Sequence, residues 1–224
     1  MPFIFKRLAL LMSIAAAFAA DKTPPAFKPG PASSFANHQT NDQVTVGAEA
    51  YDSGEKVKAA FGRLDPYQHG VLPVLVVIQN DSGNAIKLDQ IRVEYVGPNH
   101  DRVYATPAKD VRYLQGPRRP GAIGGPAGRG VKILTKKNPL EAWEIEGRAF
   151  AAQMLPAGHT ASGFFYFDTG LQMGATLYLT GMKEAASGKE LLFFELPLQG
   201  TESGKSRTPK MPVTPLPKIL FPGK

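Results

Sequence analysis

Residues 71–80, with the sequence VLPVLVVIQN, decide the fold class of this 224-residue chain. The segment is rich in β-branched residues and is almost continuously apolar from Val74 to Ile78, a pattern typical of a strand that is covered on both faces. Pro73 has no N–H group to donate to a ladder, so we expect it at the beginning of the strand or at a bulge. The segment therefore predicts a central strand of a sheet.

Shorter strand patterns lie on both sides of this segment. Residues 85–96 include the alternating apolar side chains of Ile91, Val93 and Tyr95, separated by charged residues, which predicts a strand with one wet face. Further short strands are expected at residues 43–51, 102–105, 110–114, 160–167, 175–180 and 190–198, the last two as a hairpin. Residues 55–61 fit either a strand or one helical turn.

Residues 139–154 carry the clearest helix signals. Asn138 is a good N-cap, Pro139 suits the first helical position, and Glu141 stands three residues after the cap. Residues 143–146 also alternate as a strand would, but we favour the helix. Many short strands with turn residues between them and one helix predict a mostly-β sandwich.

Three passages resemble bacterial exported domains of the immunoglobulin-like class. They are QNDSGNAI at residues 79–86, LPAG at 155–158 followed by GFFYF at 163–167, and FFELPL at 193–198. The resemblance covers roughly residues 43–198 and implies an immunoglobulin-like β-sandwich, as in uncharacterised exported proteins. It implies no activity, because these passages describe turns and core.

The N-terminus has the pattern of an export signal. Lys6 and Arg7 precede an apolar run at residues 8–20, which is shorter than the roughly 20 residues that span a bilayer. The small residues at its end predict cleavage after Ala19 or Ala20 and a periplasmic or extracellular protein. The alternative is a buried N-terminal helix, but the polar segment that follows offers nothing to bury it against. The chain has no cysteine, which excludes disulfides, thiolate metal sites and a cysteine nucleophile.

Domain organisation follows from these patterns. We expect a signal peptide at 1–20, a flexible lead-in at 21–42, the sandwich at 43–198 and a disordered Pro/Lys-rich tail at 199–224. Within the sandwich, a Gly/Pro/Arg-rich loop at 115–137 is expected to be disordered, because residues 116–130 contain six glycines and three prolines.

Positive charge is concentrated in the loop and the tail. The net charge of the chain is +7, yet residues 115–137 alone carry six cations and no acid, and the tail carries five cations against one acid. Such segments bind phosphate, anionic lipid or acidic polymers. The candidate contacts for an anionic partner are Arg118, Arg119, Arg129, Lys132, Lys136, Lys137, Lys205, Arg207 and Lys210. A solvated loop and tail that only keep the protein soluble are the alternative.

The sequence contains little that indicates a catalytic or metal-binding site. The four histidines are at least 31 residues apart, and no Gly-x-Ser-x-Gly elbow is present. We therefore predict no catalytic, cofactor or metal residues.

The leading hypothesis is a non-enzymatic, exported binding or accessory module of the cell envelope, with an anionic envelope component or an envelope protein as partner. We do not expect nucleic acid as its normal partner. One alternative is a hydrolase of an envelope polymer, with a cleft formed by Asp65, His69, His100 and Glu141. Another is a periplasmic assembly factor that pairs an edge strand with a client by β-augmentation.

Overall fold

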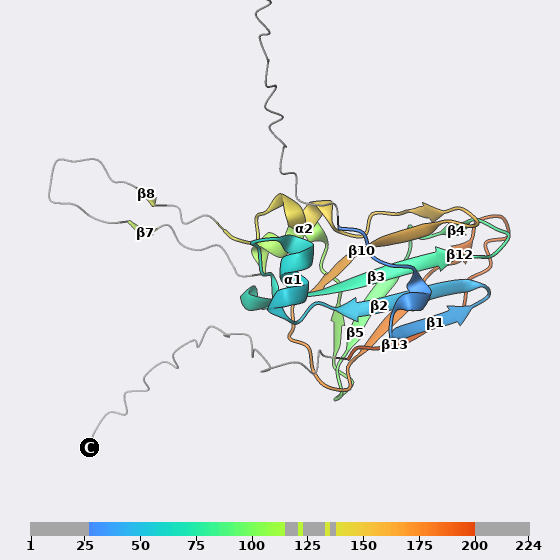
Figure 1. Cartoon of the computed structure of the whole chain (residues 1–224), viewed down its shortest axis with the longest axis horizontal. Coiled ribbons are helices and arrows are strands. Elements are labelled where there is room, and N and C mark those ends of the chain that lie inside the picture. The colour runs from blue at the N-terminus through green and yellow to red at the C-terminus, as the bar shows by residue number, and fades with distance from the viewer. Residues whose placement is uncertain (1–26, 115–120, 123–132, 135–137, 200–224) are drawn as a thin grey trace, which may run out of the picture.

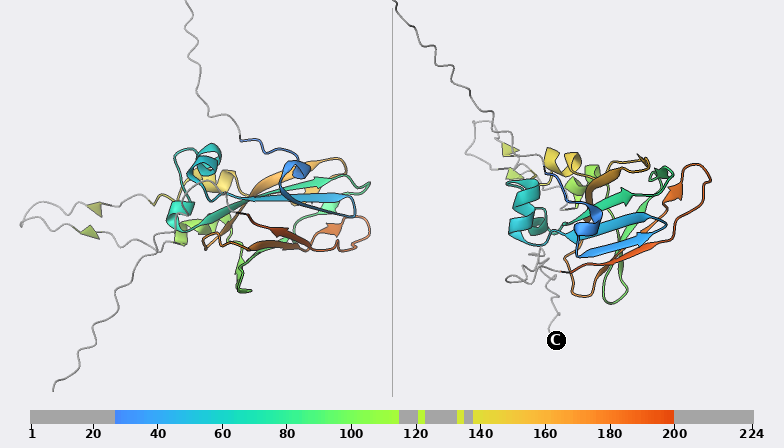
Figure 2. Two further views of the ribbon diagram at one scale, coloured as in Figure 1. Left: turned by 60° about the horizontal axis from the view of Figure 1, so that its bottom comes forward. Right: turned by 45° about the vertical axis from the view of Figure 1, so that its right-hand side comes forward.

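Two antiparallel four-stranded sheets face each other in the computed structural model, which describes residues 27–114, 121–122, 133–134 and 138–199 (Figures 1 and 2). The first sheet has the order β1 (Asn37–Asn41), β2 (Val44–Ala50), β3 (Leu72–Asn80) and β10 (Thr160–Phe167). The second has the order β13 (Phe194–Pro197), β11 (Thr176–Thr180), β5 (Arg92–Val96) and β6 (Arg102–Tyr104). The predicted mostly-β sandwich is confirmed.

The remaining strands are short. A third sheet has the order β12 (Lys183–Glu184), β4 (Ile86–Lys87) and β9 (Met154–Leu155), and β7 (Gly121–Ala122) pairs with β8 (Ile133–Leu134). Figure 1 shows β4 and β12 at one end of the sandwich and the helices α1 and α2 at the other end.

Strand β3 is central and buried on both faces, as predicted. Every residue of β3 except Gln79 is buried, and Pro73 lies at its beginning. Its neighbours β2 and β10 both run antiparallel to it. One face of the sheet meets the second sheet, where the Tyr95 and Phe167 ring centroids are 6.1 Å apart. This apolar strand is therefore the centre of the hydrophobic core.

Five short helical segments cover the sheet ends and loops: η1 (Ala32–Ser34), α1 (Gly54–Phe61), η2 (Tyr67–His69), η3 (Ala108–Tyr113) and α2 (Trp143–Gly147). Helix α1 begins after Ser53, whose side chain accepts a hydrogen bond from Lys56 N, and it buries Val57, Ala60 and Phe61. The Phe61 ring packs against Phe164 of β10, with centroids 4.8 Å apart. Of the two predicted possibilities for residues 55–61, the helix is correct.

The predicted helix at 139–154 is much shorter in the structure. Only Trp143–Gly147 is helical, because the edge of β10 binds the following segment. Phe164 N donates to Arg148 O at 2.9 Å, and Phe150 N donates to Phe164 O at 3.1 Å. A Cβ on Gly163 would collide with the Phe150 backbone, so glycine permits this approach. Pairing with a sheet edge outweighs the local helix signals.

Three other predicted segments are corrected. Residues 85–96 form two strands in different sheets rather than one, because the chain turns at buried Leu88, whose carbonyl accepts from Ile91 N. Residues 110–114 belong largely to η3 rather than to a strand. The lead-in predicted at 21–42 contains η1 and the edge strand β1, which adds a hairpin partner to β2 through a tight turn at Asp42 and Gln43.

The loop predicted to lack regular structure contains the β7–β8 pair at residues 121–122 and 133–134. Backbone pairing satisfies N–H and C=O groups even in a Gly/Pro-rich sequence. The predicted signal at 1–20 lies outside the described residues, as does the predicted tail apart from residue 199. No helix among the described residues is long and apolar enough to cross a membrane.

One seam of the sandwich is closed by side-chain amides. Gln39 Oε1 accepts a hydrogen bond from Glu195 N at 2.8 Å, and Asn41 Nδ2 donates to Phe193 O at 3.0 Å. These contacts join edge strand β1 of the first sheet to edge strand β13 of the second. They satisfy backbone groups that an edge strand would otherwise present to another chain.

Buried Asn80 joins the end of β3 to the 80–84 turn and to strand β9. Its side chain is fully buried, and its Nδ2 donates to Asn84 O at 2.8 Å and to Leu155 O at 3.1 Å. Its Oδ1 accepts from Ser82 N at 3.1 Å and from Ser82 Oγ at 2.6 Å. The side chain thus fixes the 80–84 turn against strand β9.

Candidate functional site

The nine predicted contact residues all lie outside the described part of the chain. They are Arg118, Arg119, Arg129, Lys132, Lys136, Lys137, Lys205, Arg207 and Lys210. The structure does describe the two points where the basic loop at 115–137 leaves and rejoins the body. These points lie beside η3 and just before α2.

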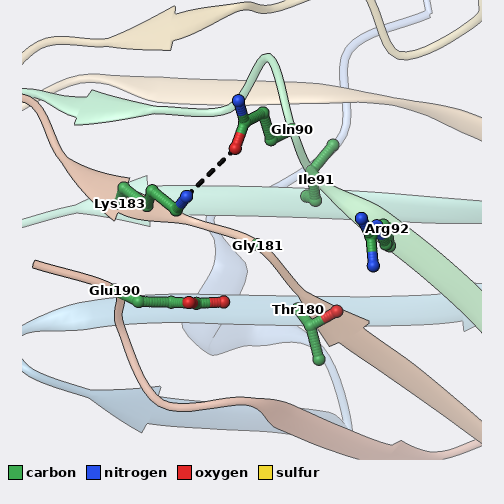
Figure 3. Close-up of a pocket in the computed structure, with 7 residues that line it drawn as sticks. All are labelled: Gln90, Ile91, Arg92, Thr180, Gly181, Lys183 and Glu190. Atoms are coloured by element: carbon green, nitrogen blue, oxygen red, sulfur yellow. Dashed lines mark hydrogen bonds between the residues drawn. The ribbon is translucent and has the colours of Figure 1, made fainter. Parts of the chain in front are cut away.

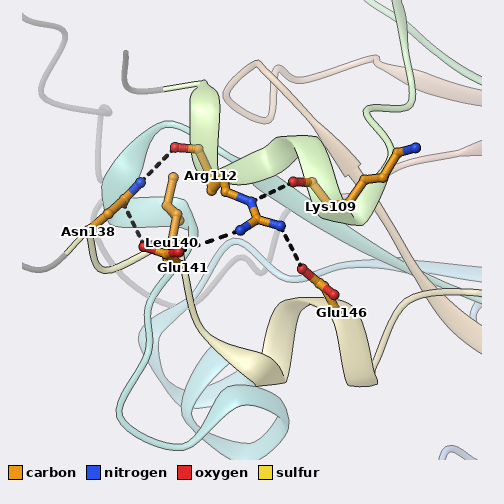
Figure 4. Close-up of polar contacts among 6 residues, drawn as sticks. All are labelled: Lys109, Arg112, Asn138, Leu140, Glu141 and Glu146. Carbon is orange, nitrogen blue, oxygen red and sulfur yellow. Dashed lines mark hydrogen bonds and ion pairs between the residues drawn. The ribbon is translucent and has the colours of Figure 1, made fainter. Parts of the chain in front are cut away.

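A polar cluster joins the two ends of the basic loop (Figure 4). Arg112 on η3 donates through Nε to Lys109 O at 2.8 Å, and its terminal nitrogens reach Glu141 Oε1 at 3.5 Å and Glu146 Oε1 at 3.2 Å. Asn138 Nδ2 donates to Arg112 O at 2.7 Å. Because Lys109 and Arg112 precede the loop and Asn138, Glu141 and Glu146 follow it, we call this cluster the loop clamp.

Burial anchors the loop clamp from beneath. Val111 is fully buried and Leu140 is 2% exposed, so each end of the loop is held by an apolar side chain in the core. Asn138 Oδ1 also accepts from Leu140 N at 3.0 Å, so Asn138 organises a turn here and does not cap α2. The Arg112 ion pairs are partly exposed, and such pairs contribute about 0–1 kcal/mol each. The apolar anchors therefore provide most of the clamp's stability.

The residues considered for a hydrolase cleft lie on three different segments of the fold. Asp65 Oδ1 accepts from Gln68 N at the beginning of η2, which also contains His69. His100 occupies a positive-φ position in the β5–β6 turn, and Glu141 belongs to the loop clamp. The described residues contain no group of three or more His, Asp or Glu side chains that could hold a metal ion.

Buried tyrosines hold loops against the core. Tyr166 Oη donates to Ile145 O at 2.8 Å, and burial raises the pKa of Tyr166 above its ordinary value. Tyr95 Oη donates to Gly170 O at 3.2 Å and accepts from Gln172 N at 2.9 Å, and burial raises the Tyr95 pKa as well. The raised pKa values keep these hydroxyls protonated and suited to structural hydrogen bonds.

A polar hollow of about 630 Å³ opens where β5 and β11 meet the third sheet (Figure 3). We call it the polar hollow; it is lined by Gln90, Ile91, Arg92, Thr180, Gly181, Lys183 and Glu190. Arg92 and Thr180 face each other in the β5–β11 register, and Lys183 lies on β12. Figure 1 shows β12, which carries Lys183, and α2, which carries Glu146, at opposite ends of the sandwich.

The backbone beneath the polar hollow is tightly constrained. Gly181 has φ +84°, and a Cβ there would collide with the Gln90 carbonyl oxygen. Met182 is 1% exposed, and its carbonyl accepts from Leu191 N at 2.8 Å. The turn after β11 therefore packs directly on the segment before β5, so the two walls of the polar hollow have a fixed separation.

Opposite charges face the polar hollow without pairing. Lys183 and Glu190 are opposite each other in an isolated bridge, yet Lys183 Nζ donates to Gln90 Oε1 at 3.0 Å. Arg92 and Glu190 are both exposed, and neither takes part in an ion pair with another described residue. Figure 3 shows the Arg92 and Glu190 side chains on different sides of the hollow.

A second, more apolar groove of about 310 Å³ lies along the seam between β6 and β10. The Phe150 and Phe165 rings on its wall are stacked with centroids 5.2 Å apart. The groove shares Ile91 and Arg92 with the polar hollow. The two depressions thus adjoin at the beginning of β5.

Sequence inspection missed the polar hollow. Its lining residues are spread over a hundred positions and follow no motif, and the fold alone brings them together. The one local signal is glycine at 181 directly after a strand pattern, which indicates a turn but no ligand.

Comparison with known proteins finds neither a matching family model nor a matching curated protein. Among solved structures, a putative ApaA protein from Bordetella pertussis is 12% identical with a TM-score of 0.33, over 73% of this chain and 97% of that one. A functionally unknown protein from Listeria monocytogenes is 14% identical with a TM-score of 0.30, over 71% and 79%. A secreted protein from Mycobacterium tuberculosis is 13% identical with a TM-score of 0.28, over 76% and 98%. Similarity at these TM-scores carries no inference about the function of this chain.

Proposed function

We propose that this protein is an exported, non-enzymatic binding or accessory module of the bacterial cell envelope. Its partner is an anionic envelope component or an envelope protein with an acidic surface. The basic residues of the loop at 115–137 and of the tail make the contact. The signal-like N-terminus supports export, because its charged start, apolar run and small-residue end fit a cleavable signal.

The loop clamp is the observation that carries this proposal. It brings Arg112 and Asn138 together across 26 residues of sequence, so the basic loop begins and ends at one place on the body. The six cations of the basic loop, which contains no acidic residue, therefore belong to a segment whose two ends are attached to the body at one place. A concentration of charge at one place raises the local density of an anionic partner more than the same charges spread over the surface.

The sandwich edge offers less support for β-augmentation at β13. The side chain of Gln39 already bonds to Glu195 N of β13, and that of Asn41 bonds to Phe193 O directly before the strand. An added strand would have to displace both amides. We therefore prefer contact through charge to strand addition at this edge.

Pelleting with isolated envelopes tests the proposal. The chain from Asp21 to Lys224 is mixed with envelopes at low salt, beside a loop variant in which six cations become glutamine: Arg118, Arg119, Arg129, Lys132, Lys136 and Lys137. A matched control neutralises six exposed cations elsewhere: Lys28, Lys58, Arg63, Lys87, Lys109 and Lys189. We expect the loop variant to lose most of its binding and the control to retain it. Equal loss in both variants, or no pelleting of the unaltered chain, would contradict the proposal.

Removal of the tail separates the two basic segments. A chain that ends at residue 198 keeps the whole second sheet, because β13 ends at Pro197. We expect a smaller loss of envelope binding than in the loop variant, since the tail carries five cations against one acid and the loop carries six cations and no acid. A tail deletion that abolishes binding while the loop variant binds normally would assign the contact to the tail alone.

A further inference from the structure

We propose that the polar hollow binds a small zwitterion, with its carboxylate on Arg92 and its ammonium group on Glu190. This inference goes beyond the envelope contact, because it uses the end of the second sheet and none of the residues of the basic loop. The ligand is a free amino acid or the charged end of a short peptide, which present the same two groups.

The walls of the polar hollow are formed before a ligand binds. Gly181 packs against the Gln90 backbone, and the neighbouring residues Leu88 and Met182 are buried in the core. Arg92 and Thr180 are held opposite each other by the β5–β11 ladder. A ligand therefore meets walls with a fixed spacing and does not have to order the backbone, which is one of the main costs of binding.

The hollow carries charges of both signs. Arg92 offers a planar guanidinium with paired donors that match a carboxylate, and Lys183 lines the same hollow with its ammonium group bonded to Gln90. Glu190 offers only acceptors when ionised, which suits an ammonium group. Because Lys183 turns to Gln90 and leaves Glu190 unpaired among the described residues, both signs of charge remain available. A ligand with a single charge would satisfy one wall only.

The size and polarity of the hollow suit a small polar ligand. A volume of about 630 Å³ lies within the range of roughly 300–1,000 Å³ that is usual for small-molecule sites. The Gln90 amide and the Thr180 hydroxyl add uncharged hydrogen-bonding groups to the walls, and Ile91 is the one apolar side chain among the described lining residues. Such walls favour a polar ligand over the apolar ligands that most pockets hold.

An NMR titration tests the site directly. ¹⁵N-labelled chain from Asp21 to Lys224 is titrated with glycine, β-alanine, 4-aminobutyrate and glycylglycine, which separate the two charges by increasing distances. We expect at least one of them to shift the amide signals of Arg92, Gly181 and Lys183 saturably, with a Kd of about 0.1–10 mM. Tighter binding of an amino acid points to a free metabolite, and tighter binding of glycylglycine points to a peptide end.

Ligands with a single charge test whether binding requires both charged groups. Acetate and methylamine each carry one of the two groups, and we expect both to bind at least about tenfold more weakly than the best zwitterion. Equal binding of acetate, or no saturable shift with any zwitterion up to about 50 mM, overturns the proposal.

Paired substitutions locate the two charges. We expect Arg92→Gln and Glu190→Gln each to weaken the best zwitterion at least about tenfold. Lys87→Gln and Glu195→Gln remove the same charges from exposed positions that do not line the hollow, and we expect less than a twofold effect. Arg92→Lys keeps the positive charge but loses the paired guanidinium donors, so this variant should bind the best zwitterion with intermediate affinity. If Lys87→Gln weakens binding as much as Arg92→Gln, or Glu195→Gln as much as Glu190→Gln, the proposed site is wrong.

Discussion

Asn80 provides the sharpest test of how the sandwich is held together. The side chain is fully buried and makes four hydrogen bonds, two as donor to Asn84 O and Leu155 O and two as acceptor from Ser82. At about 0.5–1.5 kcal/mol each, four bonds give roughly 2–6 kcal/mol. Since Ser82 and Asn84 lie near the surface, where water replaces part of the loss, we expect Asn80→Ala to lower the free energy of unfolding by about 3 kcal/mol.

The Asn80→Asp variant separates hydrogen bonding from packing, because the two side chains have nearly the same shape. A carboxylate keeps both acceptor bonds from Ser82, but it places a charged oxygen where Nδ2 now faces two carbonyl oxygens at 2.8 and 3.1 Å. We expect this variant at pH 7 to be less stable than Asn80→Ala by about 1–2 kcal/mol, since an uncompensated buried charge is added.

The pH dependence of Asn80→Asp has a definite sign. Burial and the two carbonyls raise the pKa of the introduced carboxyl in the folded state above the value of about 3.9 in the unfolded chain. The folded state then binds more protons, so stability falls as the pH rises from about 4 through the raised pKa. As the pH is lowered, the difference in free energy of unfolding between Asn80→Asp and the more stable Asn80→Ala should therefore become smaller.

Urea unfolding followed by far-UV circular dichroism measures these differences. Trp143 is 68% exposed and is a poor fluorescence reporter of the core. Asn84→Ala is the matched control, because the Asn84 side chain is exposed and bonds only to Glu184 among the described residues; we expect a loss below about 1 kcal/mol. An Asn80→Asp variant as stable as Asn80→Ala at pH 7, or a deficit that grows on acidification, would refute the reasoning.

Three further predictions concern the fold. Gln43 has φ 62° in the β1–β2 turn, so Gln43→Gly should raise the free energy of unfolding by about 0.5–1 kcal/mol in urea titrations, and a loss would show that the turn is not strained. Gly163→Ala places a Cβ against the Phe150 backbone and should lower the melting temperature by at least about 5 °C, whereas an unchanged melting temperature would mean that segment 148–150 does not pair with β10. Burial raises the pKa of Tyr166, so only the unfolded tyrosine ionises as the pH rises above about 10, and the free energy of unfolding should fall there. Tyr166→Phe should reduce this alkaline loss of stability. An identical pH profile of the free energy of unfolding in both proteins would contradict the raised pKa of Tyr166.

The strands that depend on continuous burial were predictable from the sequence. Strand β3 follows from its run of β-branched residues, and β10 was expected at the residues where it occurs. The short length of α2 was not predictable, because Asn138, Pro139 and Glu141 have the pattern of a helix start. In the structure Asn138 organises a turn instead, and α2 begins only at Trp143. The edge of β10 overrides the helix pattern by binding Arg148 and Phe150 through the backbone, a contact that no local pattern encodes.

The candidate site shows the same limit. The charge of the basic loop can be counted in the sequence. The attachment of both loop ends at one place depends on the contact of Arg112 with Asn138, which the sequence does not show. The polar hollow depends on Arg92 and Glu190, which nearly a hundred residues separate, so no spacing rule connects them. Only the pairing of β5 with β11 and of Lys183 with Glu190 brings those charges to one place.

The salt dependence of envelope binding tests the central claim most directly. The affinity of the chain from Asp21 to Lys224 for isolated envelopes is measured at several salt concentrations, for the unaltered chain, the six-residue loop variant and the matched body variant. We predict a steep fall of log affinity with log salt for the unaltered chain and the body variant, and a much shallower slope for the loop variant, because each neutralised contact removes released counterions. The same slope in all three proteins would contradict the claim that the basic loop makes the contact.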